Sequence, residues 1–202
     1  MGQTEREQTA IEIFRRAGGV LRTAEAIRRG IHRREFYGLR DSGVLERLSR
    51  GVYRLADLPR LGEPDLVTVA ARVPKAVIAV VSALHFHGLT TEIPHVVSIA
   101  LPRGTATPLL DWPPLDIYRM SSPTYSAGIE EHDRDGVTLR VYGAAKTVAD
   151  CFKFRSRVGV DVAVEGLRSG LGERRFTPAE VLRAAECLRV DTVMRPYLEA
   201  MQ

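Results

Sequence analysis

The segment from Ile31 to Leu55 constrains this chain most, because it reads as a short helix, a glycine stop and a β-hairpin. When the helix is drawn at about 100° per residue, its two faces differ in character. One face carries two apolar side chains that can pack inward, Phe36 and Leu39. The other face carries the polar side chains: Arg33, Arg34, Tyr37 and Arg40. Such a helix fits the major groove of DNA, because arginine binds both guanine edges and phosphates.

The residues around this helix predict a known layout. A first helix ends at Gly18-Gly19, and Thr23 is expected to cap a second helix over residues 24–29. The hairpin has its predicted tip at Ser49-Arg50-Gly51. Three short helices and a hairpin match the winged helix-turn-helix, in which the third helix enters the groove and the hairpin forms the wing.

The positive charge of the chain is concentrated in the same region. Residues 1–56 contain 12 Arg and 7 acidic residues, a net charge of +5, whereas residues 57–202 have a net charge of −1. A basic surface that binds nothing is the alternative interpretation. The organised helix and wing favour nucleic acid, because a clustered positive surface attracts the phosphate backbone.

Three motifs in this region follow one another. They are G-G-x-x-x-T at Gly18, Gly19 and Thr23, an Arg-rich helix with Arg33 and Arg34, and L-x-R-x-x-x-G-x-Y at Leu45, Arg47, Gly51 and Tyr53. Together they resemble the N-terminal domain of AbiEi-family antitoxins, the antitoxin components of type IV toxin–antitoxin systems. Three later segments, S-A-L-H-F-H-G-L, V-V-S-I-A-L-P-R-G and V-Y-G-A-A-K-T-V-A-D-C-F-K-F, resemble the C-terminal region of that family. The resemblance spans about residues 9–200.

Two positions depart from the family pattern. His32 stands where a Ser or Thr cap is common, which predicts a less well capped start of the third helix. Gly38 stands where a larger side chain is usual, and glycine costs a helix about 1 kcal/mol relative to alanine.

The remainder of the chain predicts a second domain. Residues 1–56 form the expected DNA-binding domain, residues 57–64 a Pro- and Gly-containing linker, and residues 65–202 an antitoxin-like α/β domain. The fold class is therefore α+β, a winged helix-turn-helix followed by a mixed α/β domain with a small sheet and several helices.

Several elements of the second domain can be predicted individually. The apolar run 76–89 is expected to form a buried helix. Strands are expected over residues 95–101, 115–120 and 128–142, the last folded into a hairpin at Asp135-Gly136. Further helices are expected over residues 144–154 and 160–167, after a capping box at Thr177 and Glu180, and in a last segment broken near Pro196.

No arrangement in the sequence indicates catalysis or a metal site. His85 and His87 are two residues apart on a predicted helix, so both side chains cannot easily face one metal ion. The acidic residues near the Asp135 turn fit a solvated hairpin better than a nuclease centre: Glu130, Glu131, Asp133 and Asp135. Lys146, Thr147 and Asp150 lack a preceding glycine-rich loop, so an exposed or capping role is expected. Cys151 and Cys187 lack metal-site or disulfide spacing and are expected to be free thiols.

The sequence therefore predicts a DNA-binding protein that is not an enzyme and needs no cofactor. Nine residues are predicted to contact DNA: Arg22, Thr23, His32, Arg33, Arg34, Tyr37, Arg40, Ser49 and Arg50. The expected partner is double-stranded DNA of the protein's own promoter, with inverted repeats. The resemblance implies autorepression and antitoxin activity, and a functional or direct partner in a nucleotidyltransferase-like toxin. Without a signal peptide or membrane segment, a cytoplasmic location is expected.

Two other function classes remain open from the residues alone. The first is a nuclease-like enzyme that a winged helix delivers to DNA, with Glu131 and Asp133 as its candidate acids. The second is a repressor that senses a small molecule in a pocket under the segment 76–89.

Overall fold

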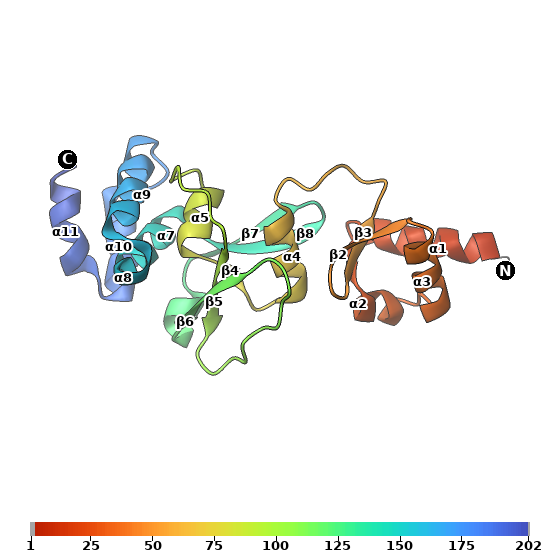
Figure 1. Ribbon diagram of the computed structural model, residues 1–202. Coiled ribbons are helices and arrows are strands. Elements are labelled where there is room, and N and C mark those ends of the chain that lie inside the picture. Colours follow the sequence, from red (N-terminus) through yellow and green to blue (C-terminus); the bar gives the residue numbers. More distant parts are fainter. Residues whose placement is uncertain (1–2, 202) are drawn as a thin grey trace. The chain divides into compact units, whose positions relative to one another are not determined.

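The computed structural model of the chain describes residues 3–201 (Figure 1). These residues pack as two compact units. The first unit takes the chain up to Lys75 together with residues 107–114 and 132–139. The second unit takes residues 76–106, 115–131 and the chain from Arg140 onward.

The first unit contains the predicted three helices and hairpin. Its elements are α1 (Gln3–Arg16), β1 (Val20–Arg22), α2 (Thr23–Arg28), α3 (Arg33–Asp41), β2 (Leu45–Ser49), β3 (Val52–Leu55) and α4 (Pro64–Arg72). The three strands form an antiparallel sheet in the order β1-β3-β2. Helix α4 packs against this sheet, so the first unit extends beyond the hairpin.

The core of the first unit explains why α3 has a fixed orientation. Phe36 and Leu39 are buried, as their helical spacing predicts, and Phe14 of α1 lies beneath them in the same cluster. The Phe36 ring meets the Tyr53 ring of β3 edge-on, with centroids 5.0 Å apart. Burying an aromatic side chain of this kind contributes about 1.5–3 kcal/mol, which holds the opposite face of α3 toward solvent.

The second unit combines a mixed sheet with a helical half. Its first elements are β4 (Val77–Ile78), α5 (Val80–Phe86), β5 (Val97–Pro102), β6 (Leu115–Met120) and α6 (Ser122–Ser126). Strands β7 (Ile129–Arg134) and β8 (Val137–Tyr142) complete its sheet, and their residues 132–139, which include the hairpin turn, belong to the first unit. The sheet order is β6-β5-β4-β8-β7. The helical half consists of α7 (Ala144–Lys153), α8 (Arg155–Val158), α9 (Val160–Gly172), α10 (Pro178–Leu188) and α11 (Asp191–Glu199). Figure 1 shows these helices following one another at the C-terminal end of the unit.

The expectation of one helix over residues 76–89 was wrong in its first part. Val77 and Ile78 form β4, which pairs antiparallel with β5 and parallel with β8 in the middle of the sheet. The chain then turns at Val80, the first residue of α5, whose φ is +51°. A short apolar run fits a buried strand as well as a buried helix, and β-branched residues favour the strand.

Other predictions for this half were confirmed, with one exception. The hairpin turns at Asp135-Gly136, with φ values of +53° and +73°, and Thr177 forms the expected capping box with Glu180. The expected break near Pro196 was wrong, because α11 continues through it. The fold is thus α+β, a winged helix-turn-helix followed by a mixed α/β part. No helix within residues 3–201 is long and apolar enough to span a membrane.

Candidate nucleic-acid interface

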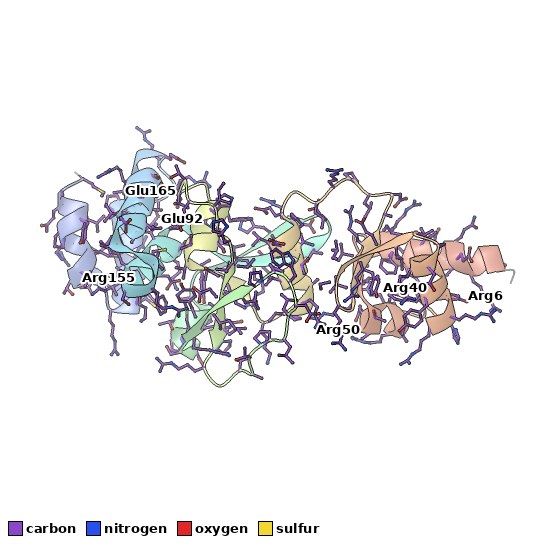
Figure 2. All side chains as sticks on the ribbon, viewed as in Figure 1. Arg6, Arg40, Arg50, Glu92, Arg155 and Glu165 are labelled. Atoms are coloured by element: carbon purple, nitrogen blue, oxygen red, sulfur yellow. The ribbon has the colours of Figure 1, made fainter. Side chains whose placement is uncertain are left out.

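The outward face of α3 presents the side chains that the sequence assigned to DNA. Arg33, Arg34, Tyr37 and Arg40 are all exposed. Arg40 lies over the Tyr37 ring, with its guanidinium carbon 4.8 Å from the centroid, and pairs with Asp41 at 2.6 Å. The hydrogen bond to Asp41 is the main cause of a raised pKa at Arg40, so this cation is firmly charged. Figure 2 shows Arg40 on α3 and Arg50 at the tip of the wing.

Helix α3 is better capped than the sequence predicted. The Nδ1 atom of His32 accepts a hydrogen bond from the Arg34 backbone N–H at 3.3 Å. The Glu35 carboxylate accepts one from the His32 N–H at 3.3 Å, which completes a capping box. A neutral imidazole nitrogen can act as the acceptor that Ser or Thr usually supplies. His32 therefore has a structural role at the start of the candidate recognition helix.

The wing contributes one clear candidate. Arg50 is exposed at the hairpin tip, beside Gly51, whose φ of +78° the tight turn requires. Ser49 is buried, with 8% of its surface exposed, and its hydroxyl has no hydrogen-bond partner in the described chain. The side chain of Ser49 thus points into the first unit and away from the surface at which DNA would bind. Arg47 on β2 is exposed as well, although it belongs to the L-x-R-x-x-x-G-x-Y motif and was not among the nine residues predicted to contact DNA.

Arg22 and Thr23 differ from their expected roles. The Arg22 guanidinium donates hydrogen bonds to the backbone carbonyls of Ala71 and Arg72 at the end of α4. Burial is the largest cause of its lowered pKa. Thr23 is the first residue of α2 and makes no side-chain cap, which corrects the predicted N-cap. Its backbone N–H donates to the Gly51 carbonyl at 3.0 Å and joins α2 to the wing tip.

The arginines that make no hydrogen bond or ion pair within the described chain are the strongest candidates for the interface. Within residues 3–201, no hydrogen bond or ion pair engages five arginine side chains of the first unit: Arg33, Arg34, Arg47, Arg50 and Arg60. Others are engaged internally, as Arg15 is with Asp57 at 2.7 Å and Arg54 with Glu46 at 2.9 Å. Arg60 lies in the segment between β3 and α4, and the other four lie on α3 and the wing, the two elements that a winged helix applies to DNA. Their charge is available to phosphates and base edges.

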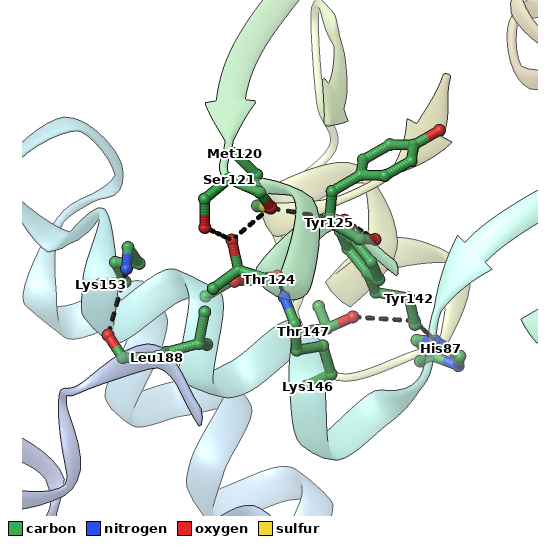
Figure 3. Close-up of polar contacts among 11 residues, drawn as sticks. His87, Met120, Ser121, Thr124, Tyr125, Tyr142, Lys146, Thr147, Lys153 and Leu188 are labelled. Atoms are coloured by element: carbon green, nitrogen blue, oxygen red, sulfur yellow. Dashed lines mark hydrogen bonds and ion pairs between the residues drawn. The ribbon is translucent and has the colours of Figure 1, made fainter. Parts of the chain in front are cut away.

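The second unit holds a buried polar cluster where the sequence predicted exposed or capping residues. Lys146 and Asp150, four residues apart on α7, form an ion pair of 2.6 Å with side chains 6% and 0% exposed. The Lys146 ammonium also lies 4.0 Å from the centroid of the Tyr142 ring. Figure 3 shows Thr147 and His87 both meeting the Tyr142 carbonyl, at 2.9 and 2.7 Å. These residues are therefore buried. The sequence motif alone gave no sign of this.

The remaining polar groups show no metal-binding arrangement in the part of the chain described. No group of three His, Cys, Asp or Glu side chains is placed to hold a metal ion within residues 3–201. His85 is exposed and His87 buried, so the two point to different surroundings. The acidic residues of the β7–β8 hairpin are exposed, as a solvated hairpin predicts: Glu130, Glu131, Asp133 and Asp135.

Comparison with known proteins bears on the first unit most directly. Residues 8–56 match the protein family described as "Transcriptional regulator, AbiEi antitoxin". The N-terminal domain is similar to an AbiEi-type domain. The match begins within α1 and covers α2, α3 and the wing, and it confirms the resemblance that the N-terminal motifs indicated. The AbiEi-type domain supports a regulatory antitoxin role for the chain.

A solved structure resembles the chain over almost its full length. It is the crystal structure of the RV2827C protein from Mycobacterium tuberculosis, with a TM-score of 0.53 and 17% sequence identity. The alignment covers 96% of this chain and 78% of that one. At this identity the similarity concerns the fold alone. No protein with a curated description matches the chain.

Proposed function

We propose that this protein is a DNA-binding autorepressor and the antitoxin of a type IV toxin–antitoxin module. The observation that carries the DNA-binding part is the cluster of uncommitted arginines on α3 and the wing of an AbiEi-type domain. The proposed operator is double-stranded DNA in the protein's own promoter, arranged as inverted repeats.

The proposed contacts divide into two kinds. Arg33 and Arg34 lie at the first turn of α3, the part of a recognition helix that reaches base edges, and they supply sequence readout. Arg40, stacked on Tyr37, lies further along the same face. Arg50 at the wing tip contacts phosphate and adds affinity without sequence preference.

The DNA-binding proposal can be tested with the full chain. A labelled duplex from the region upstream of its gene should bind in fluorescence anisotropy, and the slope of log K against log salt should reveal the phosphate contacts. Charge reversal of Arg33 and Arg34 to Glu should abolish this binding. Reversal of both Arg15 and Arg16 on α1 to Glu changes the net charge equally and is the matched control, because these side chains are 59% and 80% exposed and pair only with surface carboxylates among described residues. Equal loss in both variants would attribute binding to net charge rather than to α3.

The antitoxin part of the proposal concerns a nucleotidyltransferase-like toxin encoded alongside. The support is the AbiEi-type domain, together with the resemblance of the second half to the C-terminal region of that family. Co-expression with the adjacent toxin should rescue growth. The double Glu variant, expressed from a foreign promoter, should still rescue, because neutralisation is assigned to the second unit. Rescue by wild type but not by this variant would instead assign neutralisation to the N-terminal domain or to repression.

A recess in the second unit favours one alternative, a repressor that senses a small molecule. The recess measures about 540 Å³, and its wall includes His87, Glu130, Lys146, Phe176 and Arg183. This volume lies in the range of small-molecule sites. A metabolite screen by thermal shift tests this alternative. The alternative function requires a compound that raises the Tm of the protein and also changes its affinity for the operator.

A further inference from the structure

Gly38 occupies an unusual place in α3. It is the sixth residue of a nine-residue helix, and it is exposed. Glycine in the interior of a helix shifts the folding equilibrium against the helix by roughly fivefold relative to alanine, because it has more conformational freedom to lose. A glycine at this position therefore calls for a reason.

The structure of the first unit does not supply that reason. The helix does not end at Gly38: its carbonyl accepts the Ser42 N–H at 2.9 Å, and Ser42 is the C-cap. Its backbone is helical, in contrast to Gly43, which follows the helix with a φ of +78°. A Cβ built on Gly38 meets no atom of the described chain within 4 Å. Alanine would thus fit at this position and would stabilise the helix.

The surroundings of Gly38 are those of the candidate DNA face. With Arg34, Tyr37 and Asp41 it forms one outward stripe at the i, i+3, i+4 and i+7 positions of a helix. These residues line a recess of about 750 Å³ whose wall also includes Arg6, His32 and the carboxylates of Glu7 and Glu35. Among the four residues of this stripe, only Gly38 has no side chain that would keep a binding partner away from the helix backbone.

We infer that Gly38 is the point at which α3 makes its closest approach to the base edges in the major groove. The inference rests on the proposed DNA-binding function and specifies how the recognition helix is seated. Glycine is used where a backbone must come close to a ligand, because any Cβ would separate the two. A closer helix brings the neighbouring Arg34 within reach of base edges that it would otherwise meet through water.

The test is a substitution with opposite effects on folding and on binding. Gly38→Ala should raise the Tm of the full chain by about 2–4 °C, as a roughly fivefold gain in the folding equilibrium predicts for a protein of this size. It should weaken affinity roughly tenfold or more for a duplex that the wild type selects from a random library. Affinity for unselected DNA should change much less. Gly172→Ala is the control, because Gly172 is also exposed, helical and open to a Cβ but lies at the end of α9 in the second unit.

Each other outcome decides against the inference in a distinct way. If Gly38→Ala binds the selected duplex as the wild type does, DNA does not approach Gly38 closely, while the DNA-binding proposal stands. A change in oligomeric state by light scattering, with unchanged affinity, would assign this face to a second copy of the chain. Loss of affinity together with a lowered Tm would attribute the loss to a damaged fold. If the wild type selects no sequence at all, the inference and the DNA-binding proposal both fail.

Discussion

The buried ion pair of the second unit leads to a quantitative prediction about stability. Lys146 and Asp150 are one turn apart on α7, and the Lys146 ammonium lies 2.6 Å from the Oδ2 atom of the Asp150 carboxylate. The other oxygen of that carboxylate, Oδ1, has no partner in the described chain. Two charges removed from water have lost their hydration, and their attraction only partly compensates for it. The pair therefore adds little net stability, yet each charge depends on the other.

The consequence is strong non-additivity between two substitutions. Lys146→Met and Asp150→Leu each keep the approximate side-chain volume but leave one buried charge unpaired. Each should lower the free energy of unfolding by about 3–5 kcal/mol. The double variant leaves no buried charge and should lie close to wild type or exceed it by up to about 4 kcal/mol.

The assay is urea denaturation at pH 7 with the four members of this double-mutant cycle. Lys153→Met on the same helix is the matched control, because the Lys153 ammonium is near the surface and donates to the Leu188 carbonyl at 3.1 Å. The control should cost about 1 kcal/mol or less. Additive losses in the double variant would refute the reasoning, since they would show that each charge stabilises the fold through separate contacts.

Further predictions concern the first unit and the pH dependence of the second. Arg33→Ala and Arg34→Ala should each cost about 1–3 kcal/mol at a selected duplex and relax sequence preference, measured by anisotropy with single-base variants. Arg50→Ala should weaken binding to all duplexes alike and reduce the salt slope by about one unit. His32→Ala removes the α3 cap and should lower the free energy of unfolding by about 1 kcal/mol in urea. Burial raises the pKa of Asp150 to about 6. A raised pKa means that the folded state holds the proton more tightly, so wild-type stability relative to the double variant should be greatest below about pH 4 and decline as the pH rises through about 6.

The first unit was predictable from sequence to an unusual degree because its signals are local. Helical spacing alone placed Phe36 and Leu39 in the core, and both are at most 2% exposed. The glycines at residues 18, 19 and 51 marked turns that have positive φ in the structure. Later in the chain, Asp135-Gly136 specified the β7–β8 hairpin for the same reason.

The predictions that were wrong concern residues whose structure depends on contacts with residues distant in the sequence. The segment at Val77 became a strand because β5 and β8 flank it on either side, which its own composition cannot specify. Lys146 and Asp150 were expected at the surface, since charged residues are seldom fully buried unless they are paired. Their pairing depends on the packing of α7, and i, i+4 spacing is equally common in exposed pairs.

Contacts between distant residues also reduce the number of candidate DNA-contacting residues. Nine residues were predicted to contact DNA on the basis of charge, polarity and position in the winged-helix layout. The structure commits the Arg22 guanidinium to the end of α4 and buries Ser49, whereas Arg33, Arg34 and Arg50 remain exposed without a partner in the described chain. A cation already bound to two carbonyls would have to surrender those bonds before it met a phosphate, so its contribution to affinity would be small. The net charge of the segment therefore overstates the number of arginines available to DNA, and a salt slope well below the count of its 12 arginines is the expected signature.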